Sequence, residues 1–409
     1  MILFLTRQIP HPPDIGLLIR QRNLLEACSS VAPVQLVFGY DSEEELTGLS
    51  DLAPLCADIH PVRMNWRSRP KGPSLVHLLK ELRATRQLVP FHSRLFFSQA
   101  IRQVVEELAP ACRLIQVERL GMVTHVQALL DRRRRSQRLI LDLDDIETDL
   151  RREWLRLSPP EGWRARSAER VDLAVLERYE SRTIPSFDRV LITSEADRRQ
   201  LGGGSELCVI PNGADVGRGP FPDESDGRTL LCLGTYGYWP NVDGLRSFIE
   251  NVLPLVRREI PDVRVLVVGR NMPEEVSRLH DGERILVSAD VPDVEPFYRR
   301  ATVSVVPLRL GGGTRLKILE AFALGTPVVS TSVGCKGLDV VHGKHLLVAD
   351  EHASFAQACL ELLRDARQRA ALTARARTLV EQRYSWLSIR SRMAGLVASL
   401  LEGADGGHA

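Results

Sequence analysis

Long hydrophobic runs are missing from this sequence. No stretch of about 18 consecutive apolar residues occurs among the 409 residues, which excludes a transmembrane helix. The apolar start, residues 1–6, is followed at once by Arg7 and a proline cluster. It therefore predicts a first buried strand and no signal peptide.

Cysteine is scarce and scattered. The seven cysteines stand singly, and no CxxC pair occurs. An odd number of isolated cysteines excludes a disulfide framework and a structural zinc site, and it indicates a reducing, cytoplasmic compartment. A GxGxxG motif after a predicted strand is also missing, which argues against a dinucleotide oxidoreductase.

Charge is nearly balanced over the whole chain but not within it. The net charge is +2, and nothing suggests a nucleic-acid partner. Residues 61–140, however, contain 16 Lys/Arg and 5 Asp/Glu, a local charge of +11, densest at Arg132 to Arg135. Two interpretations stay open: a solvated helix end, or a basic face that meets anionic lipid or an anionic acceptor.

Short apolar runs alternate with amphipathic segments along the whole chain. Such runs, rich in β-branched residues, are typical of parallel strands buried on both faces. They occur at 2–5, 34–38, 114–117, 139–143, 190–193, 230–233, 265–268, 303–306 and 328–330. Helices are predicted at 17–28, 121–131, 164–184, 243–259, 315–324 and 355–363. This alternation predicts an α/β protein with doubly wound parallel sheets.

A segment dense in Pro, Gly and Asp, residues 211–228, interrupts the alternation. It predicts two Rossmann-like domains, residues 1–215 and 216–385, followed by a helix in 386–409 that packs back towards the first domain and ends in a frayed tail. Ligands of such domains bind at the carboxyl ends of the strands, so a cleft between the two would hold two substrates.

A glycine-rich loop followed by a helix is the strongest local motif. It reads PLRLGGGTRLKILEAFALGTPVVS from Pro307, with Gly311, Gly312 and Gly313 in the loop. Thr314 is expected to cap a helix that begins near Arg315. Because free backbone N–H groups point outward at a helix N-terminus, this loop is a candidate anion site.

Charged residues in the first turns of this helix support an anion site. Arg315 and Lys317 oppose the helix macrodipole, and a bound anion would remove the conflict. Both could also simply face water. Glu320 is an i,i+3 neighbour of Lys317, so the two could form a surface ion pair, or the carboxylate could accept hydrogen bonds from the vicinal hydroxyls of a ribose.

The motif resembles the donor-binding signature of retaining glycosyltransferase family 4, which has the GT-B fold. In that family two Glu residues are separated by seven positions; Glu320 matches the second, which holds the nucleotide ribose, whereas Gly312 replaces the first, which faces the sugar. The version GGGTRLK-x-LEA resembles bacterial exopolysaccharide sugar transferases. The resemblance implies a metal-independent, retaining transfer from a nucleotide-diphosphate sugar, with no cofactor.

Other segments of the second domain extend the resemblance. The stretch from Leu233, LGTYGYWPNVDG, is similar to the family's loop after the first strand of that domain, which contacts the diphosphate. This implies donor-binding roles for Gly234, Thr235 and Asn241, with Arg315 and Lys317 supplying the positive charge. Val291, in VSADVPDV, is similar to the loop that meets the nucleobase through backbone groups.

The first domain has candidate acceptor residues. PPDIGLLIR from Pro12 resembles the family's PPD-x-GG-x-x-R loop, which implies acceptor binding by Asp14, Gly16 and Arg20, although Leu17 replaces the second glycine. Asp145, after the strand at 139–143, is the candidate for the catalytic pocket. Asp142 and Asp144 also mimic the DxD motif of metal-dependent enzymes, an alternative that would leave the glycine loop without a role.

The resemblance implies sugar transfer to a glycan or a lipid-diphosphate-linked acceptor. The family retains the configuration of the anomeric carbon, and the sequence shows no clear nucleophile. This favours attack by the acceptor hydroxyl on the same face of the sugar that the nucleoside diphosphate leaves. The expected location is the cytoplasm, with peripheral binding to the inner face of the membrane through residues 61–140. Two alternatives remain: a GT-B epimerase that needs no acceptor, and a non-catalytic nucleotide-sugar-binding subunit of a polysaccharide machine.

Overall fold

The computed structural model describes residues 1–64, 89–132, 137–157, 159–221, 224–311 and 315–403. The chain forms two compact units. The N-terminal unit comprises Met1–Ile210 and the residues from Arg390 onwards, and the C-terminal unit comprises Pro211–Ile389. None of the helices in these described ranges combines the length and the apolar character needed to cross a membrane.

The N-terminal unit is built on a seven-stranded parallel sheet in the order β3-β2-β1-β4-β5-β6-β7. Its strands are β1 Ile2–Thr6, β2 Val34–Tyr40, β3 Asp58–Arg63, β4 Leu114–Glu118, β5 Arg138–Asp142, β6 Arg189–Ile192 and β7 Leu207–Val209. The central strands β1 and β4 are buried along their whole length, as their continuous apolar runs predict.

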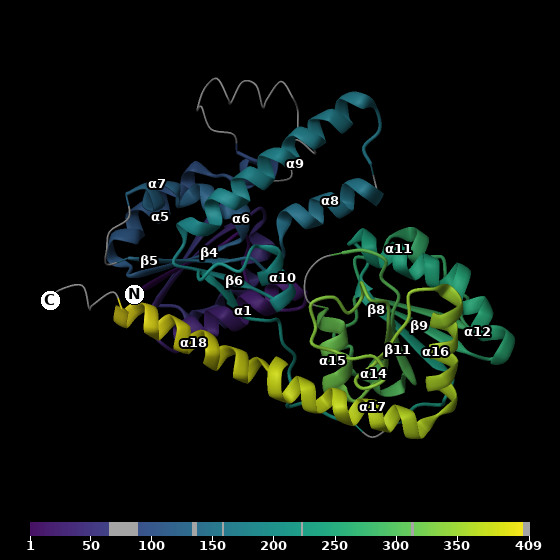
Figure 1. Cartoon of the computed structure of the whole chain (residues 1–409). Coiled ribbons are helices and arrows are strands. Elements are labelled where there is room, and N and C mark those ends of the chain that lie inside the picture. The colour runs from purple at the N-terminus through teal and green to yellow at the C-terminus, as the bar shows by residue number, and fades with distance from the viewer. Residues whose placement is uncertain (65–88, 133–136, 158, 222–223, 312–314, 404–409) are drawn as a thin grey trace. The chain divides into compact units, whose positions relative to one another are not determined.

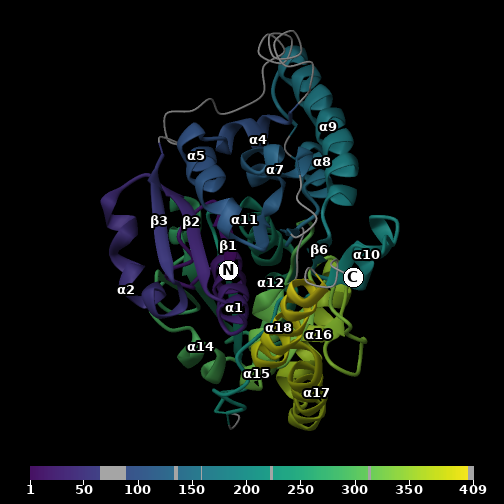
Figure 2. The ribbon, with the colours of Figure 1, turned by 90° about the vertical axis from the view of Figure 1, so that its left-hand side faces the viewer.

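Helices cover both faces of this sheet. They are α1 Gly16–Ser29, α2 Leu49–Leu52, α4 Phe91–Phe96, α5 Gln99–Leu108, α6 Arg119–Met122, α7 Gln127–Asp131, α8 Glu147–Leu157, α9 Trp163–Thr183 and α10 Glu195–Gln200. Figures 1 and 2 show α5 and α7 on one side of the sheet and α1 on the other. Ser98 caps α5 and Ser194 caps α10, each accepting a backbone N–H with its side chain.

The C-terminal unit contains a six-stranded parallel sheet in the order β10-β9-β8-β11-β12-β13. Its strands are β8 Thr229–Thr235, β9 Arg264–Arg270, β10 Ile285–Ala289, β11 Val303–Val306, β12 Val328–Ser330 and β13 Leu347–Val348. Its helices are α11 Trp239–Ser247, α12 Leu253–Glu259, α13 Glu274–Ser277, α14 Glu295–Arg300, α15 Leu316–Leu324, α16 His352–Arg364 and α17 Ala366–Leu379.

Two apolar cores lie on the two faces of the C-terminal sheet. Successive residues of β8 alternate between them: Leu230 and Cys232 join the core under α11, α12 and α16, whereas Leu231 joins the core under α14, α15 and α17. Figure 1 shows α14 and α15 on one side of β8 and β11, and α12 and α16 on the other. Gly325 ends α15 with a left-handed φ of 89°.

The boundaries of the compact units differ from the predicted domain boundaries. Residues 211–215 lie in the C-terminal unit, where Ala214 pairs with Ser385, and not in the first domain. Helix α18 (Trp386–Gly403) begins in the C-terminal unit and continues in the N-terminal unit from Arg390. Arg390 Nη1 is 2.8 Å from a carboxylate oxygen of Glu26 on α1, which attaches this part of α18 to the N-terminal unit.

Candidate functional site

The C-terminal sheet has its topological switch point between β8 and β11. These neighbouring strands lead into α11 and α15, which cover opposite faces of the sheet. Ligands of doubly wound sheets bind at the carboxyl ends of the strands at this point. We call the residues gathered there, from 234–241 and 307–320, the C-terminal site.

Lys317, in the first turn of α15, reaches across to α11. Its Nζ donates to Asn241 Oδ1 over 2.8 Å, and Asn241 Nδ2 donates to the carbonyl oxygen of Thr235, also over 2.8 Å. Burial lowers the pKa of Lys317 to about 7, and the neighbouring Arg315 acts in the same direction. A bound anion would oppose both effects and favour the charged ammonium.

Gly234 permits the close approach of β8 to these side chains. A Cβ at this position would lie 3.0 Å from Asn241 Cγ and 3.1 Å from Lys317 Nζ. A larger residue would therefore press against Asn241 and Lys317, which would have to move by a few tenths of an ångström. The structure thus brings together four of the predicted donor-side residues, Gly234, Thr235, Asn241 and Lys317.

Arg315 is buried and occupies the cap position of α15. Its guanidinium donates to the carbonyl oxygen of Gly311, which has a left-handed φ of 119°. A Cβ on Gly311 would lie 2.9 Å from Arg315 Nη2 and 3.2 Å from Tyr238 Oη. Glycine is therefore required here both by conformation and by space.

The helix α15 begins at Leu316, which agrees with a predicted start near Arg315, but the cap position is held by Arg315 and not by Thr314. The Arg315 side chain makes no capping hydrogen bond. The predicted cap, Thr314, and the glycines Gly312 and Gly313 lie outside the described residues. Arg315 and Lys317 still place two cations at the positive end of the helix dipole, which is unfavourable until an anion binds.

Glu320 lies on the next turn of α15. Its Oε2 is 3.4 Å from Tyr298 Oη, which also donates to the carbonyl oxygen of Lys317 over 3.0 Å. Burial raises the pKa of Glu320 to about 7. The Glu320 carboxyl group is thus half-buried and has Tyr298 on α14 as a hydrogen-bond partner. This partner was not identified from the sequence.

Val291, the predicted nucleobase contact, follows β10. Its side chain packs against the core that contains Tyr298, which places it on the same side of the sheet as Glu320. A further ion pair was also missed: Arg309 donates to both carboxylate oxygens of Asp243, over 2.9 Å and 2.5 Å. This pair fixes the loop after β11 to α11.

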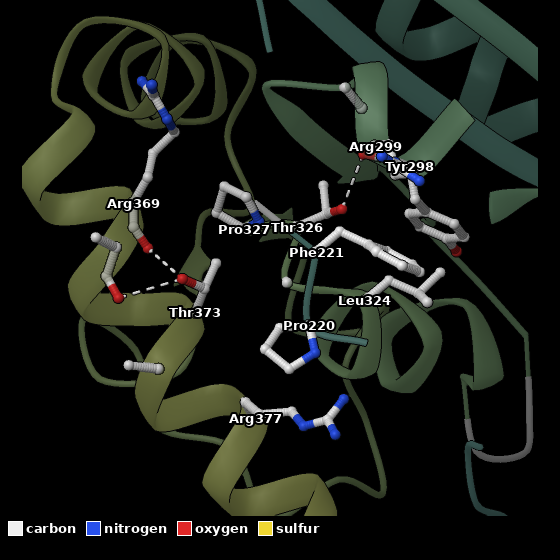
Figure 3. Close-up of a pocket in the computed structure, with 14 residues that line it drawn as sticks. Pro220, Phe221, Tyr298, Arg299, Leu324, Thr326, Pro327, Arg369, Thr373 and Arg377 are labelled. Carbon is white, nitrogen blue, oxygen red and sulfur yellow. Dashed lines mark hydrogen bonds between the residues drawn. The ribbon is translucent and has the colours of Figure 1, made fainter. Parts of the chain in front are cut away.

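A cavity of about 350 Å³ lies at the opposite end of the same strands. Figure 3 shows its lining, which includes Tyr298 and Pro327 before β12. The guanidinium of Arg369 donates to the carbonyl oxygens of Leu362 and Leu363, and that of Arg377 donates to those of Ala323 and Val216. These arginines thus stabilise the wall of the cavity. Tyr298, which also lines it, contacts Glu320 through its hydroxyl group.

The N-terminal sheet has its switch point between β1 and β4, and charged residues gather there. Arg7 follows β1, and its backbone N–H donates to Glu118 at the end of β4 over 2.7 Å. Burial raises the pKa of Glu118 and lowers that of Arg7. We call these two residues, together with Arg119, Asp144 and Asp145, the N-terminal site.

Arg119 organises the N-terminal site. It has a left-handed φ of 54° and binds Asp144 through two hydrogen bonds, over 2.7 Å and 2.5 Å. Burial disfavours the charged carboxylate of Asp144, but Arg119 outweighs this and lowers its pKa. Asp145 Oδ2 lies 3.7 Å from the same guanidinium, so the predicted pocket residue belongs to this cluster.

Arg20 does not have the exposure expected of an acceptor contact. Its side chain is fully buried and donates to Asp142 over 2.6 Å and to the carbonyl oxygen of Ile210 over 2.8 Å. It therefore joins α1 to β5 inside the unit. The predicted acceptor residues Asp14 and Gly16 lie before and at the start of α1, and both are half-buried.

The DxD alternative is not supported by the positions of these carboxylates. Asp142 pairs with Arg20 and Asp144 pairs with Arg119, so each carboxylate already has a cationic partner. Across the part of the chain that the structure describes, no group of three His, Cys, Asp or Glu side chains is arranged to hold a metal ion.

Sequence comparisons match parts of the chain to known proteins. Residues 227–365 match the model of a family described as Glycosyl transferases group 1, and this range includes the whole C-terminal site. A phosphatidyl-myo-inositol mannosyltransferase of Mycolicibacterium smegmatis is 30% identical over 231 residues, 54% of this chain and 58% of that protein. An uncharacterized 44.6 kDa protein in the cps region of Klebsiella pneumoniae is 29% identical over 185 residues, 42% of this chain and 46% of that protein. The chain spans about half the length of these curated relatives.

Solved structures match nearly the whole chain. Sucrose-phosphate synthase from Thermosynechococcus elongatus has a TM-score of 0.68 at 18% identity and covers 98% of this chain and 99% of its own. HepE of Anabaena, in complex with UDP and glucose, has a TM-score of 0.64 at 16% identity and covers 97% and 99%. The predicted fold, two parallel-sheet α/β units of the GT-B type, is therefore confirmed.

Proposed function

We propose that this protein is a retaining glycosyltransferase that moves a sugar from a nucleotide-diphosphate sugar to a glycan or a lipid-diphosphate-linked acceptor. The observation that supports this most directly is the pair of cations, Arg315 and Lys317, at the N-terminus of α15 beside the switch point. A nucleoside diphosphate supplies the anion that these cations and the helix dipole favour.

The donor would lie along α15. Lys317 and Arg315 would bind the diphosphate together with the backbone N–H groups of the helix start. Glu320, one turn further on, would accept hydrogen bonds from the two ribose hydroxyls, with Tyr298 holding its carboxyl group in place. Val291 lies on the same side of the sheet and would contact the nucleobase.

The chemical step would depend on stabilising the leaving group. As the bond between the anomeric carbon and the diphosphate breaks, negative charge grows on the diphosphate oxygen. Preorganised cations and N–H groups at that position lower the barrier, because they are already oriented when the charge develops. The acceptor hydroxyl would enter on the same face, and the departing oxygen would take its proton, which retains the anomeric configuration.

The N-terminal site would bind the acceptor. Asp145 would line the pocket beside Arg119, and Asp14 and Gly16 would approach the acceptor from the loop before α1. Arg20, buried against Asp142, would stabilise the unit and would not touch the acceptor. A relative named for a phosphatidylinositol substrate and another named for a cps region motivate a lipid-linked acceptor in the synthesis of an exopolysaccharide or another cell-surface polysaccharide.

Binding to the inner face of the cytoplasmic membrane is part of this proposal. Several described arginines of residues 61–140 already have protein partners: Arg102 pairs with Glu106, Arg138 with Asp188, and Arg113 donates to the carbonyl oxygen of Leu401. The positive charge available for membrane binding would therefore come largely from the basic residues in 65–88 and 133–136. These residues lie outside the described residues. Sedimentation with anionic vesicles should therefore be weak and should fall as salt rises.

A donor screen followed by a transfer assay tests the proposal. UDP-glucose and GDP-mannose come first, because HepE is seen with UDP and glucose and one relative is named a mannosyltransferase. A ligand that binds the folded chain raises its Tm. Transfer to lipid-linked acceptors should continue in excess EDTA, and NMR of the product should show the donor's anomeric configuration. Activity that is lost in EDTA and restored by manganese, or an inverted product, would contradict it.

A further inference from the structure

Two large aromatic side chains of the C-terminal site lie exposed. Tyr238 and Trp239, in the loop after β8 and at the start of α11, are 41% and 37% exposed. Tyr236, in the same loop, is buried and donates to the carbonyl oxygen of Cys232. Tyr236 thus belongs to the core, whereas Tyr238 and Trp239 are two adjacent aromatic residues at the surface. Aromatic side chains are common in the lining of small-molecule sites.

The loop holds these two residues at a defined position. The N–H of Tyr238 donates to the carbonyl oxygen of Thr235 over 3.1 Å, and the N–H of Asn241 donates to that of Tyr238 over 3.0 Å. Pro240, in the first turn of α11, restricts the backbone between them. The aromatic pair is therefore tied to Asn241, which is itself bonded to Lys317.

Tyr238 also reaches the loop before α15. Its hydroxyl oxygen lies 3.2 Å from the position that a Cβ on Gly311 would occupy, beside the guanidinium of Arg315. Tyr238 and the two cations are thus parts of the same C-terminal site, and Trp239 adjoins Tyr238 at the start of α11. Tyr238 lies beside Arg315 at the N-terminal end of α15, and Glu320 lies further along the helix.

The order of groups along α15 matches the order of groups in a nucleotide sugar. Successive helical residues rise about 1.5 Å, so the position of Glu320 is about 7.5 Å along the axis from that of Arg315. With the ribose at Glu320 and the diphosphate at Lys317 and Arg315, the hexosyl ring extends beyond Arg315. It then reaches the end where Gly311 and Tyr238 lie.

We propose that Tyr238 and Trp239 form an aromatic platform that binds the hexosyl ring of the donor. This inference rests on the proposed function and adds a contact that determines affinity for the sugar. A pyranose presents a face of weakly positive C–H groups, which the negative face of an aromatic ring attracts, while the hydroxyl groups at the rim stay free for polar contacts. The platform would supply affinity for the sugar in a site whose other described groups are assigned to the diphosphate and the ribose.

The test compares binding of UDP with UDP-glucose, and of GDP with GDP-mannose, by calorimetry on the full chain. For the pair that binds, Trp239→Ala should raise the Kd of the nucleotide sugar by about two- to tenfold. The Kd of the free nucleoside diphosphate should not change. Trp239→Phe, which keeps an aromatic face, should restore most of the affinity for the sugar.

Trp154→Ala is the matched control, because Trp154 is 39% exposed and lies on α8 in the N-terminal unit. It should leave both Kd values unchanged. An equal loss of affinity for the nucleotide and its sugar in Trp239→Ala, or no loss for either, would overturn the platform alone. If the wild-type chain binds neither nucleotide pair, the proposed function fails and the platform fails with it.

Discussion

Lys317 Nζ donates a 2.8 Å hydrogen bond to Asn241 Oδ1, and this bond joins the first turn of α15 to the first turn of α11. The two helices follow the strands on either side of the switch point, so the bond spans the switch point. The amide oxygen of Asn241 has no net charge. The ammonium group can therefore still be neutralised by an incoming anion.

Lys317→Met should reduce sugar transfer without destabilising the protein. Lys317 is a preorganised cation that would stabilise the leaving diphosphate. Its removal is expected to lower kcat/KM by about two to three orders of magnitude. The Tm should stay the same or rise, because burying an amine disfavours its charged form. Lys344→Met, which changes an exposed lysine of the same unit, is the control for both measurements. Unchanged kcat/KM in Lys317→Met would contradict the assigned role.

Glu320→Gln should weaken nucleotide binding specifically through the ribose. Hydrogen bonds to a charged carboxylate are stronger than those to a neutral amide, so the Kd of the nucleoside diphosphate should rise about tenfold. The 2′,3′-dideoxy nucleotide lacks both hydroxyls and should bind the variant and the wild type equally. Glu283→Gln, at an 83% exposed side chain, is the control. Equal losses for both nucleotides would place Glu320 elsewhere in the site.

Donor affinity should peak near neutral pH. Burial lowers the pKa of Lys317 to about 7, so this side chain is charged below that pH and neutral above it. Burial raises the pKa of Glu320 to about 7, so this carboxyl is ionised above that pH and neutral below it. Because both charged forms are needed, the affinity for UDP-glucose, or for GDP-mannose, should fall on either side of pH 7.

Two variants test the acidic and the alkaline fall in donor affinity separately. Lys317→Arg stays charged at all accessible pH values, so the alkaline fall should disappear. Glu320→Gln cannot ionise, so the acidic fall should disappear. Nucleotide sugars suit the measurement because their diphosphate does not titrate in this range. A profile that is flat for the wild type would show that neither group titrates in the free site.

The predicted strands and the missed strands differ by their position in the sheets. All nine predicted strands lie in the interior of a sheet, whereas the four missed strands, β3, β7, β10 and β13, lie at the edges. An edge strand is shielded on one side only and needs no continuous apolar run. In β3, for example, only Val62 is buried, and the strand includes His60 and Pro61.

The C-terminal site was more predictable than the N-terminal site because its residues lie close together in the sequence. Arg315, Lys317 and Glu320 share one helix, and the glycine loop before it marks the anion site. Glu118 and Arg119 come from β4 and its end, whereas Asp144 follows β5, and no sequence motif indicated that they would meet. Tyr298 gave no signal for the same reason, since it contacts Glu320 from another helix.

Arg20 provides the sharpest test of a sequence prediction, because its predicted role and its observed contacts disagree. Its guanidinium is fully buried against Asp142, which has a raised pKa because burial outweighs the attraction of Arg20. Arg20→Met would leave that carboxylate buried without its cation, at a cost of about 3–5 kcal/mol of unfolding free energy. Urea titration should measure this loss, and kcat per folded molecule should fall little if Arg20 does not touch the acceptor.

The pH dependence of Arg20→Met identifies the cause of the destabilisation. Without Arg20, the pKa of Asp142 rises further, and a buried carboxyl with a raised pKa costs stability only while it is ionised. The difference in unfolding free energy between the variant and the wild type should therefore shrink as the pH falls from about 8 to about 5. Arg20→Met combined with Asp142→Leu, which removes both charges, should recover most of the loss. If Arg20→Met keeps full stability but fails to bind the acceptor, the predicted role of Arg20 in acceptor binding would be correct.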